Sequence, residues 1–519
     1  MNTEIPPATD LPDAGERWVI FFALLLPAVI AFHPLANNDL PMHLAIGDWI
    51  IEHGEIPTTD PFSANGHGGT WIAHEWLAAL LFAVVYKIAG ASGLVALAVA
   101  LSALLGALQD KIARLLGVPA VARLLLLGPL WLVAGRRLML RPHLLGLCSV
   151  LGLWCITLLG RERPRLLWLA VPLMALWANL HSSFILGIAF LTFDLLIFPD
   201  GHRASSRQRI GVLVSSIAAT VLQPHGLGLF LFPFQLGLDP VFTNRVMEWV
   251  SPFSSNVSAM WFRHTFTFWV GLPLLALALL RALQQGIRHS KGKVPRAARL
   301  AIVVAIAMAL LQQRHFVLAV LLSSPLLGLW LSHWPRIWPE KMHRARRGAV
   351  VVTSAMVLML LFSGYPASIG RIPGRDIGWR RPGIGWSTIM PRTPITILAT
   401  EWQVRGAVLC EYEFGSTVVH ASGGRLQPTM DSRNTVYGAA LFLAHQSAIS
   451  DGGQLDEELE RLLALANAVL IRPPERQRKQ LTQRLATDGT WALVHVGPLC
   501  QGWVRRTAVP ENLRPSLAR

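Results

Sequence analysis

The amino-acid sequence predicts an α-helical membrane protein that crosses the bilayer many times and ends in an α/β domain outside the cytoplasm. Of its 519 residues, 53% are hydrophobic and 15% are charged, whereas soluble globular proteins usually have about a quarter of charged residues. Apolar stretches recur from residue 18 to residue 364 and then stop. Together these observations exclude a soluble enzyme, a disordered chain and a small disulfide-rich domain.

Eleven apolar stretches predict membrane-spanning helices, because about 20 apolar residues cross the hydrocarbon core. The first, residues 18–36, follows an acidic segment and is not followed by a small-residue cleavage site, so we do not expect a cleaved signal peptide. The other ten are residues 92–108, 120–135, 143–160, 165–178, 183–199, 209–223, 264–283, 299–311, 317–333 and 349–364.

The charge of the loops decides the placement of residues 74–90, which are apolar but short and contain Lys87. If this segment does not cross and residues 1–17 are cytoplasmic, the inner loops hold 20 Lys and Arg residues and the outer loops hold few. The positive-inside rule therefore favours eleven spans in a transmembrane domain of residues 18–364, with 74–90 half-buried on the outer side. The net charge of +16 then needs no nucleic-acid partner.

Two parts of the chain are predicted on the outer side. Residues 37–91 form a long first outer loop, in which Leu40, Leu44 and Ile51 lie near one face of an amphipathic helix at the membrane interface, residues 40–54. Residues 365–519 form the extracytoplasmic α/β domain, because an odd number of spans separates them from the N-terminus. The strands predicted there are residues 407–412, 417–420, 468–472 and 491–496, and the helices are 455–466 and 475–486.

Two of the four cysteines, Cys410 and Cys500, fall in this outer domain, where an oxidising compartment would permit a disulfide. Their spacing cannot show that their Cα atoms approach, so a disulfide is one hypothesis and two free thiols are the other. The remaining cysteines, Cys148 and Cys155, lie within one predicted span, where packing is the plain interpretation.

Polar side chains near membrane depth are candidates for function because their burial costs free energy. In the first outer loop Asp39 and His43 are four residues apart, so a helix would place them on one face. Asp39 could equally cap that helix. His74 and Glu75 open the half-buried segment, which adds a second imidazole and a second acid on the same side.

Three arginines on the outer side, Arg136, Arg137 and Arg141, run against the charge rule. They could meet the headgroups of outer-leaflet lipids, or they could clamp a phosphate or pyrophosphate, whose oxygens suit the planar guanidinium group. Arg314, between the ninth and tenth predicted spans, repeats the pattern. The other polar candidates on this side are Asn179, His181 and Glu248.

A divalent metal is one alternative for this side of the molecule. The groups that could bind it are His43, His74, Glu75, His181 and His315, but no spacing matches a fixed ligand motif such as HExxH. The sequence contains no P-loop, no dinucleotide fingerprint and no GxSxG motif. No cofactor is therefore assigned, and a metal stays open.

Motifs along nearly the whole chain resemble those of a bacterial, largely uncharacterised group of polytopic proteins similar to the GT-C glycosyltransferase superfamily. The most specific motif is in the first outer loop and reads Asp39-x-x-x-His43-Leu44-Ala45-x-Gly47, then Asp60-Pro61-Phe62-Ser63, then His74-Glu75-Trp76-Leu77. Further matching pieces are Arg141-Pro142, Trp177-x-Asn179-x-His181, Gln223-Pro224-x-Gly226, Glu248-Trp249-x-Ser251-Pro252, Arg314, Glu411-Tyr412-x-Phe414-Gly415, Asp431-x-Arg433 and Tyr437.

This resemblance implies a GT-C-like membrane glycosyltransferase. Such enzymes transfer a sugar from a polyprenyl-phosphate or polyprenyl-diphosphate carrier to a glycan, lipid or protein acceptor on the outer face of the cytoplasmic membrane. Asp39 matches the acidic residue of the superfamily's first outer loop, but it lacks the adjacent acidic partner that many relatives carry. By analogy Asp39, helped by His43 or Glu75, takes the proton of the acceptor hydroxyl in an inverting displacement.

In the same scheme Arg136, Arg141 and Arg314 bind the departing phosphate, and the C-terminal domain binds the acceptor or covers the site. Asp431 and Arg433 are candidates for acceptor binding, with an internal salt bridge as the alternative. Two other functions stay open: a transporter or flippase of lipid-linked sugars, and a non-catalytic assembly protein whose outer domain binds a partner. The internal repeat that many transporters contain is not visible in the sequence.

Overall fold

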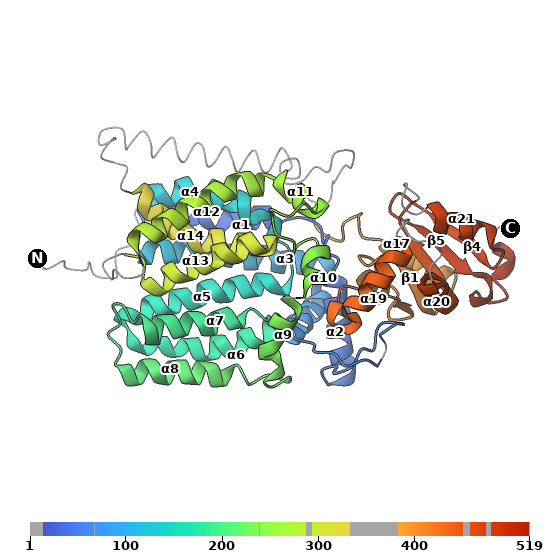
Figure 1. Ribbon diagram of the computed structural model, residues 1–519, viewed down its shortest axis with the longest axis horizontal. Helices are drawn as coiled ribbons and strands as arrows, with labels where there is room; N and C mark the ends of the chain where they lie inside the picture. The colour runs from blue at the N-terminus through green and yellow to red at the C-terminus, as the bar shows by residue number, and fades with distance from the viewer. Residues whose placement is uncertain are drawn as a thin grey trace, which may run out of the picture.

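The computed structural model describes residues 14–66, 68–237, 239–286, 293–332, 382–449, 457–473 and 479–517. Helices make up most of this part of the chain, and a smaller domain with one sheet lies at one end of the helical bundle (Figure 1). A mostly helical fold with a C-terminal α/β domain is therefore confirmed. The predicted boundary at residue 364 and the eleventh predicted span, 349–364, lie outside the described residues.

The first ten predicted spans all coincide with helices. By length and composition, four stretches of the described chain could cross a membrane: Trp76–Leu115, Pro142–Glu162, Thr267–Gln285 and Gln313–Leu331. Several others are shorter, so the predicted count of eleven spans is not confirmed. The helices are α1 (Ala14–Ala31), α3 (Trp76–Leu115), α4 (Ala120–Ala134), α5 (Pro142–Glu162), α6 (Ala170–Leu180), α7 (Phe184–Leu191), α8 (Ser206–Ala219), α12 (Phe266–Gln285), α13 (Arg296–Leu311) and α14 (Phe316–Leu331).

The predicted break between residues 74–90 and 92–108 is a bend within one helix. Residues 76–115 form the 40-residue α3, whose backbone leaves the helical conformation only at Gly90, with φ 60° and ψ −156°. Glycine adopts this positive φ without the steric penalty that a Cβ brings. Both segments are therefore helical, and one residue sets the angle between them.

The first outer loop contains α2 (Leu40–His53), which packs closely against the first half of α3. At Gly47 a Cβ would lie only 2.3 Å from the carbonyl oxygen of Ala79, so a larger residue does not fit. Leu40 and Leu44 are buried within the protein, whereas Ile51 is 41% exposed. The predicted helix is confirmed, but its apolar face covers α3 and α18 (Gly415–Ala421) instead of the membrane surface.

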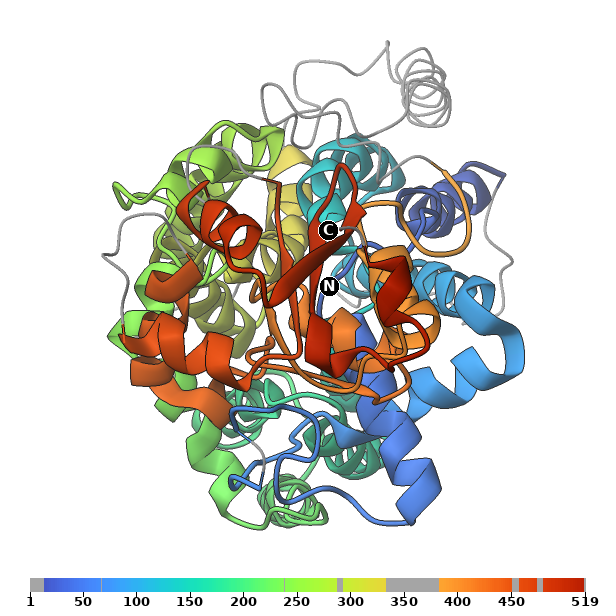
Figure 2. The ribbon, with the colours of Figure 1, turned by 90° about the vertical axis from the view of Figure 1, so that its right-hand side faces the viewer.

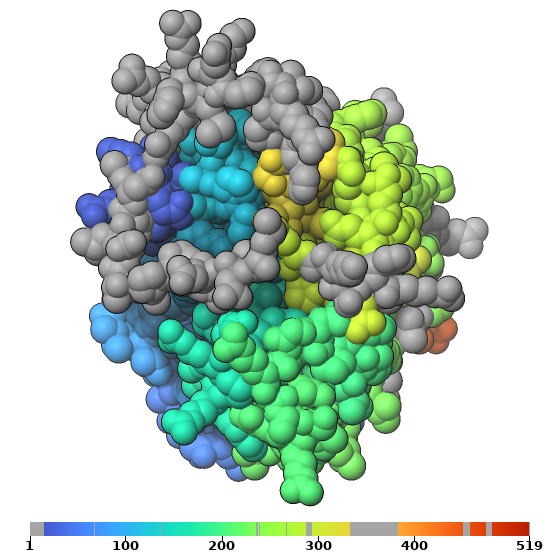
Figure 3. All heavy atoms as spheres, turned by 90° about the vertical axis from the view of Figure 1, so that its left-hand side faces the viewer, coloured from blue at the N-terminus to red at the C-terminus, as the bar shows by residue number. Residues whose placement is uncertain are grey.

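The largest hydrophobic core lies among α1, α3, α4, α5 and α12 to α14, with Trp131 fully buried at its centre. Figure 3 shows the end of the bundle that faces away from the C-terminal domain, where the described parts of several predicted inner loops lie. Ion pairs join these loops: Arg123 contacts both Glu16 and Asp110, and Arg296 contacts Asp200 at 2.6 Å. Among the described residues, basic side chains that the sequence assigns to the inner side therefore pair with acids at one end of the bundle.

Three short helices lie between α8 and α12, at the end of the bundle that faces the C-terminal domain (Figure 1). We call this end the domain-facing end. The three are α9 (Gly228–Gly237), α10 (Pro240–Arg245) and α11 (Val257–Arg263). Asp239 and Asn256 cap the last two, because their side chains accept hydrogen bonds from Val241 N–H and Ser258 N–H.

The C-terminal domain contains a five-stranded sheet with the order β2-β1-β3-β5-β4. β1 (Gly406–Cys410) pairs in parallel with β2 (Leu426–Pro428) and β3 (Ala468–Ile471). β5 (Gln501–Arg505) pairs antiparallel with β3 and with β4 (Trp491–Val496). Its helices besides α18 are α17 (Arg392–Thr396), α19 (Asn434–Ile449), α20 (Glu457–Leu465) and α21 (Lys479–Thr487).

Three of the four predicted strands and both predicted helices of this domain are confirmed. The strand predicted at residues 417–420 is wrong, because these residues belong to α18. This helix begins at Gly415, which packs so closely against Met430 that a Cβ would lie 2.0 Å from the Met430 carbonyl oxygen. Tertiary packing therefore overrides the preference of Val418 and Val419 for a strand. The disulfide hypothesis is also wrong, because Cys410 and Cys500 are buried free thiols.

The C-terminal domain touches the first outer loop and its flanking segment (Figure 2). Leu35 N–H donates to Gly385 O and Ser387 N–H donates to Leu35 O, both at 2.8 Å. Ala64 N–H donates to Pro428 O at 3.0 Å. These contacts place the carboxyl end of β2 beside the loop that carries the candidate acids and histidines.

Candidate active site

Asp39 occupies the N-cap position of α2, but its side chain makes no capping hydrogen bond. Its Oδ2 atom instead lies 3.1 Å from Nη2 of Arg141, which directly precedes α5. Asn37 Oδ1 accepts hydrogen bonds from Asp39 N–H at 3.0 Å and from Arg141 Nε at 2.8 Å. Asp39 is thus the ion-pair partner of an arginine from another loop, and the capping alternative does not hold.

Glu248 joins the same network from the loop after α10. Nη1 of Arg141 donates to its Oε1 at 2.5 Å, and Arg137 donates to its other oxygen. Burial raises the pKa of Glu248, but the two guanidinium groups outweigh this effect and hold its pKa well below the usual range. Arg137 and Arg141 are therefore paired with acids. Arg136 stands in the same 3-10 turn, Gly135–Arg137, and its side chain lies outside the described part of the structure.

Three histidine rings surround the carboxyl group of Glu75, the residue directly before α3. His43 Nε2 lies 3.6 Å from Oε2, and the Nε2 atoms of His74 and His181 lie 3.7 and 3.5 Å from Oε1. These separations exceed the usual length of a hydrogen bond. The structure therefore brings together four predicted site residues from the starts of α2 and α3 and the end of α6.

Burial sets the charge of this cluster. Burial, followed by the nearby Asp39, raises the pKa of Glu75 to about 8, although Arg141 opposes the shift. Burial also lowers the pKa of His43 to about 3, of His74 to about 4 and of His181 to about 3. Near neutral pH the three rings are uncharged, and Glu75 can both hold and release a proton.

The hydrogen bonds of His181 fix which ring nitrogen carries its proton. Ser183 N–H donates to His181 Nδ1 at 3.1 Å, and the Ser183 hydroxyl lies 2.7 Å from the same atom. Nδ1 is therefore the acceptor, and Nε2 presents an N–H group to Glu75. A ring in this tautomer offers no lone pair to a metal at Nε2. In the described part of the chain, no three His, Cys, Asp or Glu side chains are arranged to hold a metal ion.

Arg314 contacts the backbone of Glu248, whereas Arg141 contacts its side chain. Its backbone N–H donates to Glu248 O at 3.0 Å, and its guanidinium carbon stands 4.2 Å from the centre of the Trp249 ring. Its Nε donates to His315 Nε2 at 3.3 Å. None of the described Asp and Glu side chains forms an ion pair with it, so this guanidinium can bind an added anion.

Asn179 has a structural role. Its side chain accepts a hydrogen bond from Trp76 Nε1 at 2.9 Å and donates to Ala175 O and Leu222 O at 2.8 and 3.0 Å. Both of its N–H donors and one lone pair of its oxygen are used to tie α6 to the start of α3 and to the turn after α8. Asn179 therefore positions Trp76, next to Glu75, and is not free to meet a ligand.

Asp431 and Arg433 form the predicted internal salt bridge at 2.7 Å, and each of them also binds one further side chain. Arg433 Nη1 donates to Asp60 in the first outer loop at 2.6 Å, and Tyr437 donates to Asp431 at 2.7 Å. The Asp60 side chain accepts from Phe62 N–H, as the turn interpretation requires, but it is also almost fully buried under the C-terminal domain.

The site is completed by Asn37, which the sequence did not single out, and by Tyr412, which the sequence named only as part of a motif. Asn37 orients both Asp39 and Arg141, although nothing in the sequence distinguishes it from its neighbour Asn38. Tyr412 follows β1, and after burial the charge of Asp39 contributes most to raising its pKa. The C-terminal domain therefore places a phenol near Asp39, with its hydroxyl donating to Asn434 at 2.8 Å.

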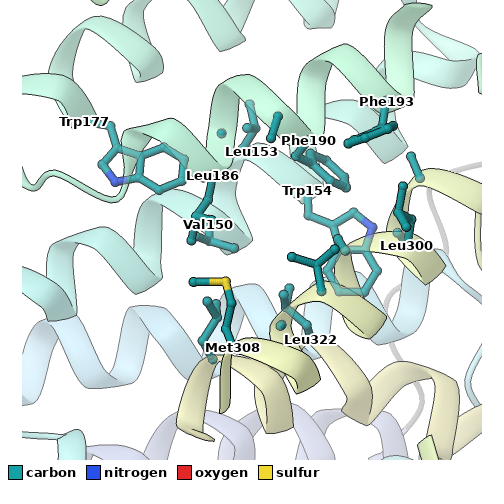
Figure 4. A pocket seen from close by; sticks show the side chains of 18 residues that line it. Val150, Leu153, Trp154, Trp177, Leu186, Phe190, Phe193, Leu300, Met308 and Leu322 are labelled. Carbon is teal, nitrogen blue, oxygen red and sulfur yellow. The ribbon is translucent and has the colours of Figure 1, made fainter. Parts of the chain in front are cut away.

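An apolar cavity lies between α5, α7, α13 and α14 (Figure 4). It encloses about 740 Å³, part of which is open to the surroundings, and its walls are almost entirely hydrocarbon. Trp177 lines one part of it, and the Trp177 indole donates to Ser183 Oγ at 3.1 Å. Because Ser183 holds His181, this cavity is connected through side chains to the cluster around Glu75.

No protein-family model matches the sequence, and no curated protein is significantly similar to it. Among solved structures, the chain is similar to the oligosaccharyltransferase of Archaeoglobus fulgidus in its apo form, with 12% identity, a TM-score of 0.53, and 88% of this chain and 70% of that chain covered. The complex of that enzyme with Zn and sulfate gives 13% identity, a TM-score of 0.53, and 95% and 74% covered. Its complex with an inhibitory peptide and a dolichol-phosphate gives 14% identity, a TM-score of 0.52, and 89% and 70% covered. This similarity shows that the chain shares the fold of that oligosaccharyltransferase.

Proposed function

We propose that the protein is a membrane glycosyltransferase that takes a sugar from a polyprenyl-phosphate-linked donor. One observation carries this proposal: Glu75, an acid with a pKa near 8, lies at the same end of the bundle as three guanidinium groups, Arg137, Arg141 and Arg314. A proton acceptor beside phosphate-binding cations is what sugar transfer from a lipid phosphate requires. The similarity to an oligosaccharyltransferase that has been solved with a dolichol-phosphate adds support.

Glu75 is the proton acceptor in this proposal. General bases work best when their pKa lies near the operating pH, and none of the described Arg and Lys side chains forms an ion pair with Glu75. Asp39 is already paired with Arg141 at 3.1 Å, so one of its carboxylate oxygens is occupied by this contact. Asp39 therefore holds Arg141 in place, and His43 and His181, both neutral, orient the acceptor hydroxyl or pass on its proton.

The donor phosphate meets Arg314 first. Its guanidinium lacks an acidic partner among the described residues and stays fixed against Trp249. Arg141 can exchange its contact with Glu248 for a phosphate oxygen without leaving Asp39, because it uses a different nitrogen for each acid. As the bond to the sugar breaks, these cations stabilise the negative charge that grows on the lipid phosphate.

The isoprenoid chain of the donor occupies the apolar cavity beside Trp177. A hydrocarbon chain that leaves lipid for a protein cavity gains free energy only if it fits closely against the cavity walls. Aromatic and branched side chains provide such walls here. The C-terminal domain, through Tyr412, covers the acceptor side. The acceptor in this scheme is a glycan, lipid or protein of the cell envelope, and the site faces outward from the cytoplasmic membrane.

The test is lipid mass spectrometry on cells that carry Glu75→Gln in place of the wild-type chain. We expect a polyprenyl-linked sugar to accumulate, because its consumption stops. Glu52→Gln, which changes an exposed carboxylate on the neighbouring helix, is the matched control and should leave lipids unchanged. Unchanged lipids and glycans with Glu75→Gln, at normal membrane levels of the protein, would reject catalysis and favour a scaffold. Accumulation on the cytoplasmic leaflet alone would favour a flippase.

A further inference from the structure

A second cluster of aromatic and basic side chains lies where α3 meets the C-terminal domain, apart from Glu75. Its members are Tyr86 in the first half of α3, Trp386, Arg392 at the start of α17, and His420 in α18. The ring centres of Tyr86 and His420 are 5.3 Å apart, those of Trp386 and His420 are 6.0 Å apart, and those of Tyr86 and Trp386 are 6.2 Å apart. We call these four side chains the interdomain cluster.

Within the described part of the chain, the interdomain cluster carries one positive charge that no acid pairs with. The Arg392 guanidinium carbon stands 4.3 Å from the centre of the Trp386 ring, and Arg392 Nη1 donates to His420 Nδ1 at 3.1 Å. Burial and the neighbouring Arg392 lower the pKa of His420 to about 4, so this ring is neutral near pH 7 and acts as an acceptor. None of the described Asp and Glu side chains forms an ion pair with Arg392.

The cluster lies next to two apolar helices, α1 and α3, near where they would meet a membrane surface. Trp386 forms a backbone bridge with Leu35, which lies just beyond the end of α1. Tyr86 belongs to α3, a helix long and apolar enough to cross a membrane, and its neighbours Val84 and Ile88 are 39% and 81% exposed. Tryptophan and tyrosine are enriched where membrane helices meet the headgroup region. The cluster therefore combines an interfacial aromatic pair with a cation.

We propose that the interdomain cluster binds the phosphate of an anionic lipid headgroup. Arg392 supplies the charge and its remaining N–H donors, and the planar guanidinium group suits phosphate oxygens. The guanidinium already covers one face of Trp386, so the ammonium of a zwitterionic lipid does not have this face to stack on. The bound lipid would lie between α3 and the C-terminal domain. This site is separate from the cavity beside Trp177, and the proposal does not depend on sugar transfer.

Native mass spectrometry of the full chain, released from detergent with phosphatidylglycerol or phosphatidylcholine, tests this assignment. We expect the wild type to retain phosphatidylglycerol selectively, and Arg392→Gln to bind it at least about fivefold more weakly, since a charge-assisted contact is lost. Arg405→Gln removes an exposed arginine of the same domain and should bind as the wild type does. Equal retention by the wild type and Arg392→Gln would overturn the proposal.

Two further measurements keep the test decisive. Thermal unfolding of the wild type should shift upward with phosphatidylglycerol and not with phosphatidylcholine, because a ligand stabilises the state that binds it. An absence of this difference counts against the site even if Arg392→Gln is poorly folded. Glycerol phosphate or inorganic phosphate that displaces the lipid at similar concentration would show a site for free anions, and the assignment to a lipid would then be wrong.

Discussion

Arg433 of the C-terminal domain donates a hydrogen bond to Asp60 of the first outer loop at 2.6 Å, across 373 residues of sequence. The same guanidinium group pairs with Asp431 at 2.7 Å and lies 4.8 Å from the centre of the Trp71 ring. Both carboxylates are almost fully buried. A buried charge network thus fixes the C-terminal domain to the loop that leads into Glu75.

Arg433→Met should destabilise the protein strongly. The variant leaves two buried carboxylates without their cation, a change that typically costs about 3–5 kcal/mol. The measurement is the midpoint of thermal unfolding in detergent. Arg461→Gln is the control, because Arg461 joins the same two regions through exposed contacts with Asn65 and Glu458, which are worth less than about 1 kcal/mol. Equal losses in the two variants would contradict the role of burial.

Glu75→Gln and Asp39→Asn should differ in their effects. Loss of a general base typically lowers the rate about 10²- to 10⁴-fold, so transfer should fall by this amount in Glu75→Gln while donor binding persists. Asp39→Asn removes the partner of Arg141 and should weaken donor binding together with the rate. Transfer assays over a range of donor concentration separate the two cases. A Glu75→Gln enzyme with a wild-type rate would show that another group accepts the proton.

The pKa of Glu75 should be visible in the pH dependence of stability. Unfolded Glu75 ionises near 4.5 and folded Glu75 near 8, so the folded chain holds one more proton between these values. The stability from this proton is complete below pH 4.5 and is lost as the pH rises through 8. His43, His74 and His181 have lowered pKa values and give the opposite slope, but only below their ordinary value of 6.5.

The window from pH 6.5 to 8 therefore isolates Glu75 from these histidines. In this window the wild type should lose up to about 1.4 kcal/mol per pH unit relative to Glu75→Gln. Thermal or denaturant unfolding at several pH values measures the difference. Parallel curves for the two proteins would mean that Glu75 titrates near its ordinary pKa. The transfer rate should rise over the same window, because the ionised form is the base.

Arg314→Gln should weaken donor binding with little loss of stability. Its guanidinium stacks on Trp249, and such a contact is worth about 0.5–2 kcal/mol. Arg137→Gln, in contrast, removes one of the two cations that pair with Glu248 and should destabilise the fold. Donor titration and thermal unfolding, measured on both variants, test this separation. If Arg314→Gln keeps wild-type donor affinity, the phosphate binds elsewhere.

Filling the apolar cavity should change the response to donor chain length. Ala301 lines the cavity, so Ala301→Phe would occupy space meant for the isoprenoid chain. We expect transfer from a long-chain donor to fall at least about tenfold, while a short-chain analogue is used as before, because its few isoprene units bury less surface. Leu311→Phe, on the exposed end of the same helix, is the control. Equal losses with both donors would place the chain outside the cavity.

The helical body could be predicted from the sequence because its signal is local. Apolar runs of sufficient length mark ten of the helices, and the described parts of the basic loops lie at one end of the bundle. The sequence could not show that residues 74–90 and 92–108 join at Gly90, since a glycine permits both a break and a bend. Nor could it identify β2, which contains only three residues, Leu426–Pro428, and exists through its pairing with β1.

Part of the candidate site could also be predicted, because several of its residues belong to sequence motifs. Asp39, His43, Glu75 and Arg141 carry motifs and proved to be neighbours. Their partners could not be predicted, because ion pairs such as Arg141 with Glu248 join residues 107 apart and depend on how the helices pack. Asn179 lies in a motif that suggests a ligand contact, but its amide is occupied by Trp76 and two backbone oxygens.

The distance between the Glu75 carboxyl group and the His43 imidazole depends on residue 47 being glycine, which has no side-chain methyl group. His43 and Glu75 lie on two helices that touch at Gly47, one turn along from His43, where a Cβ would stand 2.3 Å from the Ala79 carbonyl. Even alanine at residue 47 would wedge the helices apart and lengthen the present 3.6 Å between the two side chains. Natural or designed variants of this chain can therefore replace exposed residues of α2, but residue 47 must remain glycine.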